Sequence, residues 1–447
     1  MAYYKRLIDD KLLEWKNDAN RKPLLIRGAR QVGKSTAVRE LGRHFKYFVE
    51  INLEKQPALG QLFPENIDVK LTCEKLSGSL SVPIIPGETL LFIDEIQACK
   101  EAIMSLRYFK EDYPELHVIA AGSLLEFALE EIPSFAVGRI RSLYLYPFSF
   151  DEFLMAQGLD LMVDFKKKNA SGNPLPEKTH CDLINQLRTF YLVGGMPAAV
   201  VEWIESRNYM NVASVHHDII DSYQDDFAKY KKRVSPSLLR RTLHSVALQA
   251  GKKFIFAHVS SDIKSTAVKD ALHLLTLAGL IIPVKHSDGT GIPLGAEEND
   301  SIVKYLFFDL GLMQTMLDTP AADILMASNV DFVNKGAASE MFAGLEMMKY
   351  SDCFQKSDMH YWVNTARNCS AEVDYLRTKN GKVIPMEIKA SIQGSMQSLW
   401  IFMRKRNLHE ATRCSLENFG KFDFCDKDNN NEIRRVSISP LYALSNL

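Results

Sequence analysis

The chain has 447 residues with a formal net charge of −1; 24% of the residues are charged and 46% are hydrophobic. This length allows two to four domains, and the composition is that of an ordinary soluble protein. The absence of a basic excess means that any contact with nucleic acid must come from local patches. The sequence contains no run of 18 apolar residues, so we expect no membrane span. Seven cysteines without a C-x-x-C pair argue against a zinc site or a disulfide framework, so we expect a cytoplasmic protein with no membrane partner.

A helix is expected from residue 1 to about 20, followed by a glycine-rich pattern, G-x-x-x-x-G-K-S, from Gly28 to Ser35. An apolar strand leads into the pattern and a helix-compatible run, 36–43, follows it, which is the context in which this motif binds a nucleotide triphosphate. Glycines let backbone N–H groups turn toward phosphates. Lys34 supplies a charge to the β- and γ-phosphates, Ser35 offers a hydroxyl to Mg²⁺, and the helix N-terminus attracts the anion.

The pattern therefore predicts a site for ATP and Mg²⁺. The expected binding residues are Gly28, Ala29, Arg30, Gln31, Val32, Gly33, Lys34, Ser35 and Thr36. The alternative is a glycine-rich turn that merely ends a strand.

A continuous apolar run, 89–93, ends in the acids Asp94 and Glu95. Such a run predicts a strand buried on both faces of a parallel sheet, and the carboxyl ends of such strands are where open α/β sheets bind ligands. We expect Asp94 to hold Mg²⁺ through water and Glu95 to act as the base that polarises the attacking water. The alternative is a strand end followed by a helix N-cap. A third apolar strand ends at Ser123, which could contact the γ-phosphate or simply begin a loop.

Residues 21 to about 150 alternate strand and helix, with strands expected at 23–28, 47–53, 90–94, 118–122 and 142–146. This order is typical of a parallel, doubly wound sheet. The polar stretch 166–178 predicts an exposed loop. Residues 180 to about 230 predict helices broken at Gly194-Gly195-Met196-Pro197, which suits a helical lid.

Residues 235–287 predict a winged helix, with Ser235 as N-cap, Pro236 at the first helical position and a short strand at 254–256. In DNA-binding examples the second helix of the helix-turn-helix enters the major groove. Its four lysines offer only modest basicity, so a role in packing or protein contact is the alternative; they are Lys252, Lys253, Lys264 and Lys269.

Carboxylates gather near the end of the chain. Asn380-Gly381 is a strong signal for a two-residue hairpin loop, and counting outward from it places Asp374 opposite Glu387 and Glu372 opposite Lys389. Alternation then puts these four residues on one face, with Val373, Tyr375, Met386 and Ile388 on the other.

Two carboxylates that face each other across a hairpin repel, and a divalent metal would remove that cost. An Asp followed by E-x-K on the next strand is the pattern of the restriction-endonuclease-like fold, in which the acids hold Mg²⁺ and the lysine helps to activate water. The candidate second metal site is Glu340, Asp374, Glu387 and Lys389. The alternative is a charged outer face of an ordinary hairpin.

Nearly the whole chain resembles a prokaryotic family of AAA+ ATPases that end in a restriction-endonuclease-like domain of unknown function. The residues that carry the resemblance are 28–35, Asp94-Glu95, the run 138–153 with G-R-I and P-F-S-F-D-E-F, 194–197, Glu372-Val373-Asp374 and Glu387-Ile388-Lys389. The sequence departs from the family at Val363, where an arginine often follows the tryptophan. The resemblance implies an AAA+ P-loop core (1–155), a helical lid (156–232), a winged-helix domain (233–298) and a restriction-endonuclease-like α/β domain (299–447).

The resemblance also implies ATP hydrolysis, with Ser123 as a sensor of nucleotide state. It suggests Arg139, or less surely Arg141, as a finger that stabilises the transferring phosphoryl group; an ion pair is the alternative for Arg139. We thus expect a Mg²⁺-dependent ATPase whose nucleotide state controls a nuclease-like domain, or else a nucleotide-gated scaffold without nuclease activity. Beyond ATP and ADP, the partners left open are DNA, a protein and further copies of the chain.

Overall fold

The computed structural model describes residues 3–132, 138–169, 173–230, 234–319, 335–366, 370–390, 395–426 and 431–447. The chain divides into two compact units. The first unit consists of Met1–Pro147 with two short segments, Leu277–Gly279 and Asp352–Lys356. The second unit consists of Phe148–Thr276, Leu280–Ser351 and Ser357–Leu447. The predicted division into four domains is finer than this and stays a prediction.

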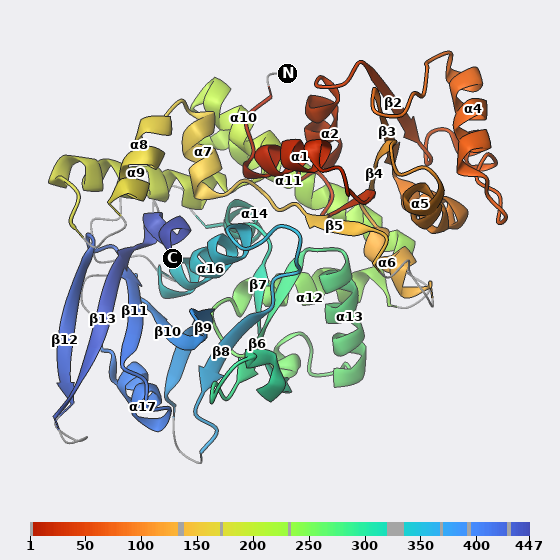
Figure 1. Cartoon of the computed structure of the whole chain (residues 1–447). Helices are drawn as coiled ribbons and strands as arrows, with labels where there is room; N and C mark the ends of the chain where they lie inside the picture. Colours follow the sequence, from red (N-terminus) through yellow and green to blue (C-terminus); the bar gives the residue numbers. More distant parts are fainter. Residues whose placement is uncertain are drawn as a thin grey trace. The chain divides into compact units, whose positions relative to one another are not determined.

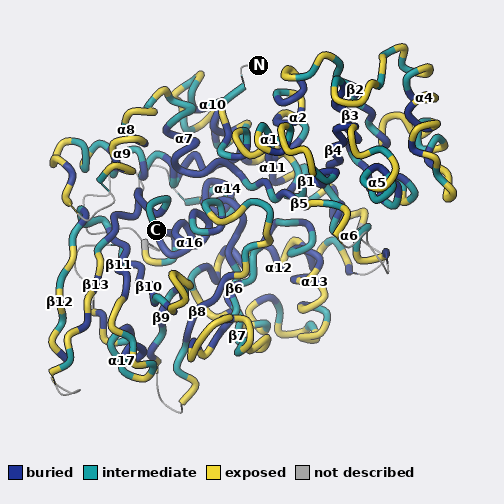
Figure 2. The backbone as a smooth tube through the Cα atoms, in the orientation of Figure 1, coloured by how far each residue is buried: buried dark blue, intermediate teal, exposed yellow. Residues whose placement is uncertain are grey.

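The first unit contains a five-stranded parallel sheet with strand order β2-β3-β4-β1-β5 (Figure 1). Its strands are β1 (Leu24–Arg27), β2 (Tyr47–Asn52), β3 (Thr89–Asp94), β4 (His117–Ala121) and β5 (Arg141–Tyr144). This confirms the predicted α/β core with a parallel sheet. Strands β3 and β4 are buried along their whole length (Figure 2), as expected for a parallel sheet with both faces covered.

The helices of the first unit follow the strands in alternation. They are α1 (Leu7–Asn17), α2 (Lys34–Gly42), α3 (Pro57–Gly60), α4 (Val69–Leu80), the 3₁₀ turn η1 (Ile96–Ala98), α5 (Lys100–Asp112) and α6 (Leu125–Glu130). Helix α5 shows why they pack as they do, since Ile103, Leu106 and Phe109 recur at helical spacing and are all buried in the core of the sheet.

The second unit opens with a run of helices. They are α7 (Phe150–Ala156), α8 (Asp160–Lys168), α9 (Glu177–Val193), α10 (Pro197–Ser206), α11 (Tyr209–Asp226) and the 3₁₀ turn η2 (Phe227–Tyr230). The predicted break at 194–197 separates α9 from α10. Gly195 is required there, because a Cβ at this position would lie 2.2 Å from the carbonyl oxygen of Phe148.

The predicted exposed loop at 166–178 is wrong for its first residues. Helix α8 continues through Lys168, and the side chain of Lys166 is fully buried in an ion pair with the equally buried Asp151. The ammonium also donates hydrogen bonds to the carbonyl oxygen of Tyr442 and to Ser445 Oγ, both at 2.9 Å. The polar composition of this segment predicted exposure. The partners that compensate for the burial of Lys166 are distant in sequence, so the local pattern did not reveal them.

The sheet of the second unit has eight strands in the order β12-β13-β11-β10-β9-β8-β6-β7. Its strands are β6 (Ile281–Ser287), β7 (Glu298–Phe307), β8 (Met359–Val363), β9 (Glu372–Lys379), β10 (Lys382–Ile388), β11 (Glu410–Ser415), β12 (Gly420–Asp426) and β13 (Glu432–Pro440). The remaining helices are α12 (Pro236–Leu248), α13 (Ser265–Leu277), α14 (Leu310–Met316), α16 (Lys335–Lys349) and α17 (Gln397–Lys405), with 3₁₀ turns η3 (Phe256–His258), η4 (Leu294–Glu297) and η5 (Leu441–Asn446).

The segment predicted as a winged helix has its predicted N-cap. Ser235 caps α12 by accepting a hydrogen bond from the Leu238 backbone N–H, and β6 pairs antiparallel with β7. The predicted short strand at 254–256 is wrong, because Phe254 and Ile255 lie outside any helix or strand and Phe256 begins the turn η3. Strand β6 also pairs parallel with β8, so it is part of the large eight-stranded sheet.

Helices α16 and α17 cover opposite faces of this sheet (Figure 1). Tyr361 and Trp362 are neighbours on β8, so their side chains point to opposite faces. Trp362 packs on Phe402 of α17, whereas the Tyr361 ring lies under the ammonium of Lys304, which pairs with Glu340 of α16. The face under α16 therefore carries the charged groups considered below.

Candidate functional site

The glycine-rich loop leaves β1 at Arg27 and enters α2 at Lys34. It turns through backbone conformations that glycine adopts easily, with φ of 146° at Gly28 and 97° at Gly33. A Cβ at Gly28 would lie 2.1 Å from the carbonyl oxygen of Leu145. The loop thus needs glycine here, and it leads directly to the positive N-terminus of α2.

Lys34 is buried at the start of α2. Its ammonium donates to the carbonyl oxygens of Gly28, at 2.9 Å, and Ala29, at 2.7 Å. Burial lowers the pKa of Lys34 to about 8, although the charges of Glu95 and Asp94 act to raise it. The loop, the lysine and the two acids are therefore close enough to influence one another, as the sequence predicted.

Asp94, at the end of β3, accepts hydrogen bonds from two side chains. Ser35 Oγ lies 3.1 Å from Asp94 Oδ2, and Asn52 Nδ2 lies 3.2 Å from the same oxygen. Burial raises the pKa of Asp94, and the charge of Glu95 adds to the effect. A hydroxyl beside a carboxylate is a donor set that suits Mg²⁺, so the predicted pair of Ser35 and Asp94 fits such an ion.

Glu95 follows in a left-handed backbone conformation, with φ of 50°. Its carboxylate accepts hydrogen bonds from Gln97 Nε2 at 2.6 Å and from Ser123 Oγ at 3.0 Å. Burial acts to raise the pKa of Glu95, but the hydrogen bonds from Gln97 and Ser123 outweigh it and lower the pKa. The group is therefore an ionised acceptor at neutral pH, and Ser123 contacts this predicted base.

Arg139 is not brought to the loop of its own chain. It pairs with Glu111 at 3.0 Å, with the two side chains 55% and 36% exposed. Arg141 opens β5 opposite Leu24, which is the strand end away from the loop, and its guanidinium stacks on Phe354. A finger role for either arginine would require the nucleotide of a second copy of the chain.

In the second unit the predicted hairpin register is present. Lys382 pairs with Lys379 and Met386 with Tyr375, which leaves Asp374 next to Glu387. The predicted division of faces is wrong for Tyr375, because β9 has an irregularity in which Asp374 and Tyr375 together oppose Tyr361. Tyr375 Oη donates to the Glu340 carbonyl oxygen at 2.7 Å, so it lies on the same side as Asp374.

Carboxylate oxygens of Glu340, Glu372 and Asp374 all lie within 4.8 Å of one another. Lys304 from β7, which the sequence did not predict, joins them. Its ammonium is 2.6 Å from Glu340 Oε1 and also contacts Glu372, while the lysine side chain is only 1% exposed. Burial acts to lower the pKa of Lys304, but the carboxylates outweigh it and raise the pKa.

The other two predicted members form a neighbouring pair, since Lys389 Nζ lies 2.6 Å from Glu387 Oε1. Burial raises the pKa of Glu387 to about 7 and that of Glu340 to about 8, and the charge of Asp374 adds to both effects. The carboxylates suit a divalent metal, but the Lys304 ammonium already supplies a positive charge between two of them. We call Lys304, Glu340, Glu372 and Asp374 the lysine-centred cluster.

Comparison with protein families divides the chain into three matched segments. Residues 20–154 match the AAA domain. This segment contains the loop, Asp94, Glu95 and Ser123, and its α/β fold with a five-stranded parallel sheet matches an AAA+ P-loop core. Residues 184–323 and 335–444 match two domains of unknown function, DUF8612 and DUF4143.

Solved structures that match this chain do so at low identity and low TM-score. The Hsp104–ADP complex of S. cerevisiae is 13% identical with a TM-score of 0.27, covering 61% of this chain and 38% of that one. A RuvB variant of Thermotoga maritima is 14% identical with a TM-score of 0.27, covering 62% and 88%. Drosophila ORC bound to DNA is 13% identical with a TM-score of 0.25, covering 69% and 93%. The chain spans little more than a third of the Hsp104 chain, and no curated protein matches it.

Two residues of the AAA domain contact the acids and were not predicted, namely Asn52 and Gln97. Asn52 ends β2 directly beside Asp94 in the parallel register. Its position at the carboxyl end of the strand before β3 was the sequence feature that could have predicted this contact. Gln97 lies two residues after Glu95, and no pattern in the sequence around it predicts its hydrogen bond to that acid. Across the described ranges, no helix combines the length and apolar character needed to cross a membrane.

Proposed function

We propose that the AAA domain binds ATP together with Mg²⁺ and hydrolyses it. The observation that carries the proposal is the convergence of Lys34, Ser35 and Asp94 on one side of the loop, with the ionised Glu95 beside them. A glycine-rich turn without a ligand would not need a buried ammonium held by its own carbonyls next to two acids.

Each residue would then have a separate role. Lys34 would leave the loop carbonyls and bind the β- and γ-phosphates, while the N–H groups of the loop bind the remaining oxygens. Ser35 and Asp94 would hold Mg²⁺, which neutralises charge that develops on the phosphates. Glu95 would accept the hydrogen bond of the attacking water, and Ser123 would position the Glu95 carboxylate.

The first test replaces the base by its neutral isostere. We expect Glu95→Gln to lower ATP turnover by about 10²- to 10⁴-fold, the usual contribution of a general base, while ATP binding is retained. Steady-state hydrolysis and a nucleotide titration measure the two quantities. Glu88→Gln is the matched control, because Glu88 is an exposed glutamate that pairs with Lys46 on the surface of the same unit. Turnover by Glu95→Gln at the rate of the control would remove Glu95 from the mechanism.

We further propose that the nucleotide state of the AAA domain controls what the second unit holds. Asp374 and Glu387 on neighbouring strands, with Glu387-Ile388-Lys389 in sequence, support the restriction-endonuclease-like interpretation of residues 299–447. One observation favours the scaffold alternative, in which DNA or a protein is held without cleavage. The Lys304 ammonium already pairs with Glu340, one of the acids that a nuclease would use for its metal, and with Glu372 beside it.

Incubation with plasmid DNA and Mg²⁺ or Mn²⁺ separates these alternatives. We expect no cleavage by the wild-type protein, because the acids are neutralised internally. Cleavage that disappears in Asp374→Ala would contradict the scaffold and support the nuclease, whereas cleavage unaffected by this change would come from another source. The rate of ATP hydrolysis with and without DNA tests the coupling, and steep loss of DNA affinity with salt would identify phosphate contacts.

A further inference from the structure

A cavity of about 890 Å³ lies in the second unit, within the roughly 300–1,000 Å³ range of small-molecule sites. One side is formed by β9, where Tyr375, Arg377 and Lys379 line it, and other parts come from α16, the 292–295 segment and residues 444–447. The cavity is separate from the glycine-rich loop, which lies in the first unit.

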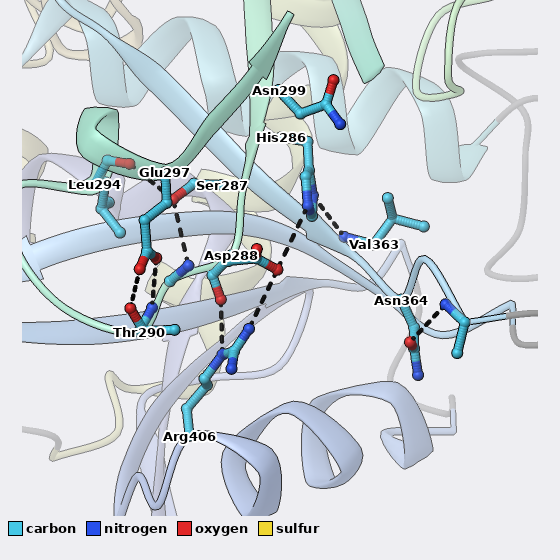
Figure 3. A network of polar contacts seen from close by, with 12 residues as sticks. His286, Ser287, Asp288, Thr290, Leu294, Glu297, Asn299, Val363, Asn364 and Arg406 are labelled. Carbon is cyan, nitrogen blue, oxygen red and sulfur yellow. Dashed lines mark hydrogen bonds and ion pairs between the residues drawn. The ribbon is translucent and has the colours of Figure 1, made fainter. Parts of the chain in front are cut away.

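The wall at 292–295 is held in place by the hydrogen bonds shown in Figure 3. Ser287 Oγ donates to the Leu294 carbonyl oxygen at 2.8 Å, and the Thr290 N–H donates to Glu297 Oε2 at 3.0 Å. Arg406 Nε donates to the Asp288 carbonyl oxygen at 2.7 Å. Leu294 itself is buried in the apolar cluster under α17. The wall is therefore fixed at both ends before any ligand binds, which lowers the entropic cost of binding.

Arg377 is half-buried beside the cavity, and no acceptor in the described residues pairs with its guanidinium by a hydrogen bond or an ion pair. Burial lowers the pKa of Arg377. The contrast with other arginines of the same sheet and its helix is clear, since each of them pairs with a carboxylate. These pairs are Arg404–Asp426, Arg406–Asp288, Arg413–Glu417, Arg434–Asp426 and Arg435–Asp423.

Lys379 is two residues further along β9, so it points to the same face as Arg377. It is exposed and likewise lines the cavity. The lining tyrosines already have partners, since Tyr375 Oη donates to Glu340 and Tyr350 Oη accepts from the Asp151 N–H at 3.1 Å. Among the described residues Asp358 is the lining residue with a side-chain carboxylate, and it is exposed without a hydrogen bond to Arg377.

The rest of the lining is mixed, with polar side chains beside the apolar side chains of Met347, Met359, Leu376 and Leu444. A cavity with apolar side chains in its lining and two cations on one wall suits a ligand that has an apolar body and an oxyanion at one end. An arginine recognises phosphate and carboxylate alike through its planar fork of donors. We propose that this cavity binds a small amphipathic oxyanion, and that Arg377 is the residue that anchors the anionic group.

The test uses the full chain and two fluorescent probes, 1-naphthyl phosphate and 1-naphthoate, with neutral 1-naphthol as reference. We expect saturable binding of at least one anion and weaker binding of naphthol. Arg377→Gln should weaken anion binding by about 10- to 100-fold, the usual effect of losing a charge-assisted hydrogen bond. Preference for one anion identifies the group as phosphate or carboxylate.

Lys382→Gln is the matched control, because Lys382 is an exposed cation on the same hairpin and does not line the cavity. Ser357→Phe is the second variant, since it would fill part of the cavity and leave Arg377 in place. We expect the first to bind like the wild type and the second to lose binding. The proposal is overturned if neither anion binds saturably, if naphthol binds as tightly, or if Arg377→Gln and Ser357→Phe both bind like Lys382→Gln.

Discussion

Replacing Lys34 with alanine should lower ATP turnover by about 10²- to 10³-fold, the usual loss when one group that stabilises transition-state charge is removed. ATP binding should weaken as well, because Lys34 is a buried cation at the loop, and the charges of Asp94 and Glu95 would then face the phosphates without it. Steady-state hydrolysis and an ATP titration check both parts of the prediction.

Lys46→Ala serves as the control for this change. Lys46 belongs to the same unit, and its ammonium pairs with Glu88 on the surface, where the two side chains are 61% and 43% exposed. The control should keep wild-type turnover, since an exposed ion pair contributes little. If Lys34→Ala hydrolyses ATP as fast as Lys46→Ala, the glycine-rich loop is not the site of hydrolysis.

Replacing Lys304 with methionine should lower the free energy of unfolding of the second unit by about 3–5 kcal/mol. Methionine has a similar length but no charge, so Glu340 would stay buried, and Glu372 partly buried, without their cation. Removing one partner of a buried ion pair leaves the other charge buried without compensation, which is why we expect a large effect. Urea unfolding of the full chain measures it.

Lys285→Met is the matched control on the neighbouring strand. Lys285 also pairs with two acids, Glu298 and Asp300, but its side chain is 37% exposed, so we expect a loss of at most about 1 kcal/mol. Addition of Mn²⁺ should restore part of the stability of Lys304→Met and none of the stability of Lys285→Met, because only the first leaves a cluster of close carboxylates. Equal stability of the two variants would show that the second unit does not depend on the Lys304 ion pairs for its stability.

The local sequence pattern was sufficient to predict the proposed nucleotide site. Each part of that site is either a short motif or a feature shared by all strands of a parallel sheet. The glycine pattern forms one turn between a strand and a helix, and the apolar run before Asp94 must be a buried strand in a parallel sheet. Parallel strands all end at one edge, so the sequence could place Asp94 near Ser35 without knowing the strand order. Asn52 was missed because its role depends on β2 lying next to β3.

The second unit shows the opposite case. The loop residues Asn380-Gly381 determined the register of the hairpin, and therefore the proximity of Asp374 and Glu387. They could not predict the irregularity opposite Tyr361, which moves Tyr375 to the side of Glu340. Nor could they predict the Lys304 ammonium, which comes from a strand that pairs with β6 and not with the hairpin.

The sequence by itself determined the parallel α/β core, the glycine-rich loop and the acids at the end of β3, because each depends on spacing within one segment. Only the tertiary structure decided which charged side chains have a partner of opposite charge. Lys166 and Lys304 are buried against acids that are remote in sequence, whereas Arg377 lies beside a cavity without a carboxylate partner in the described part of the chain. The physical reason is that the energy of a charge depends on its burial and its nearest opposite charge, and both are properties of the folded chain.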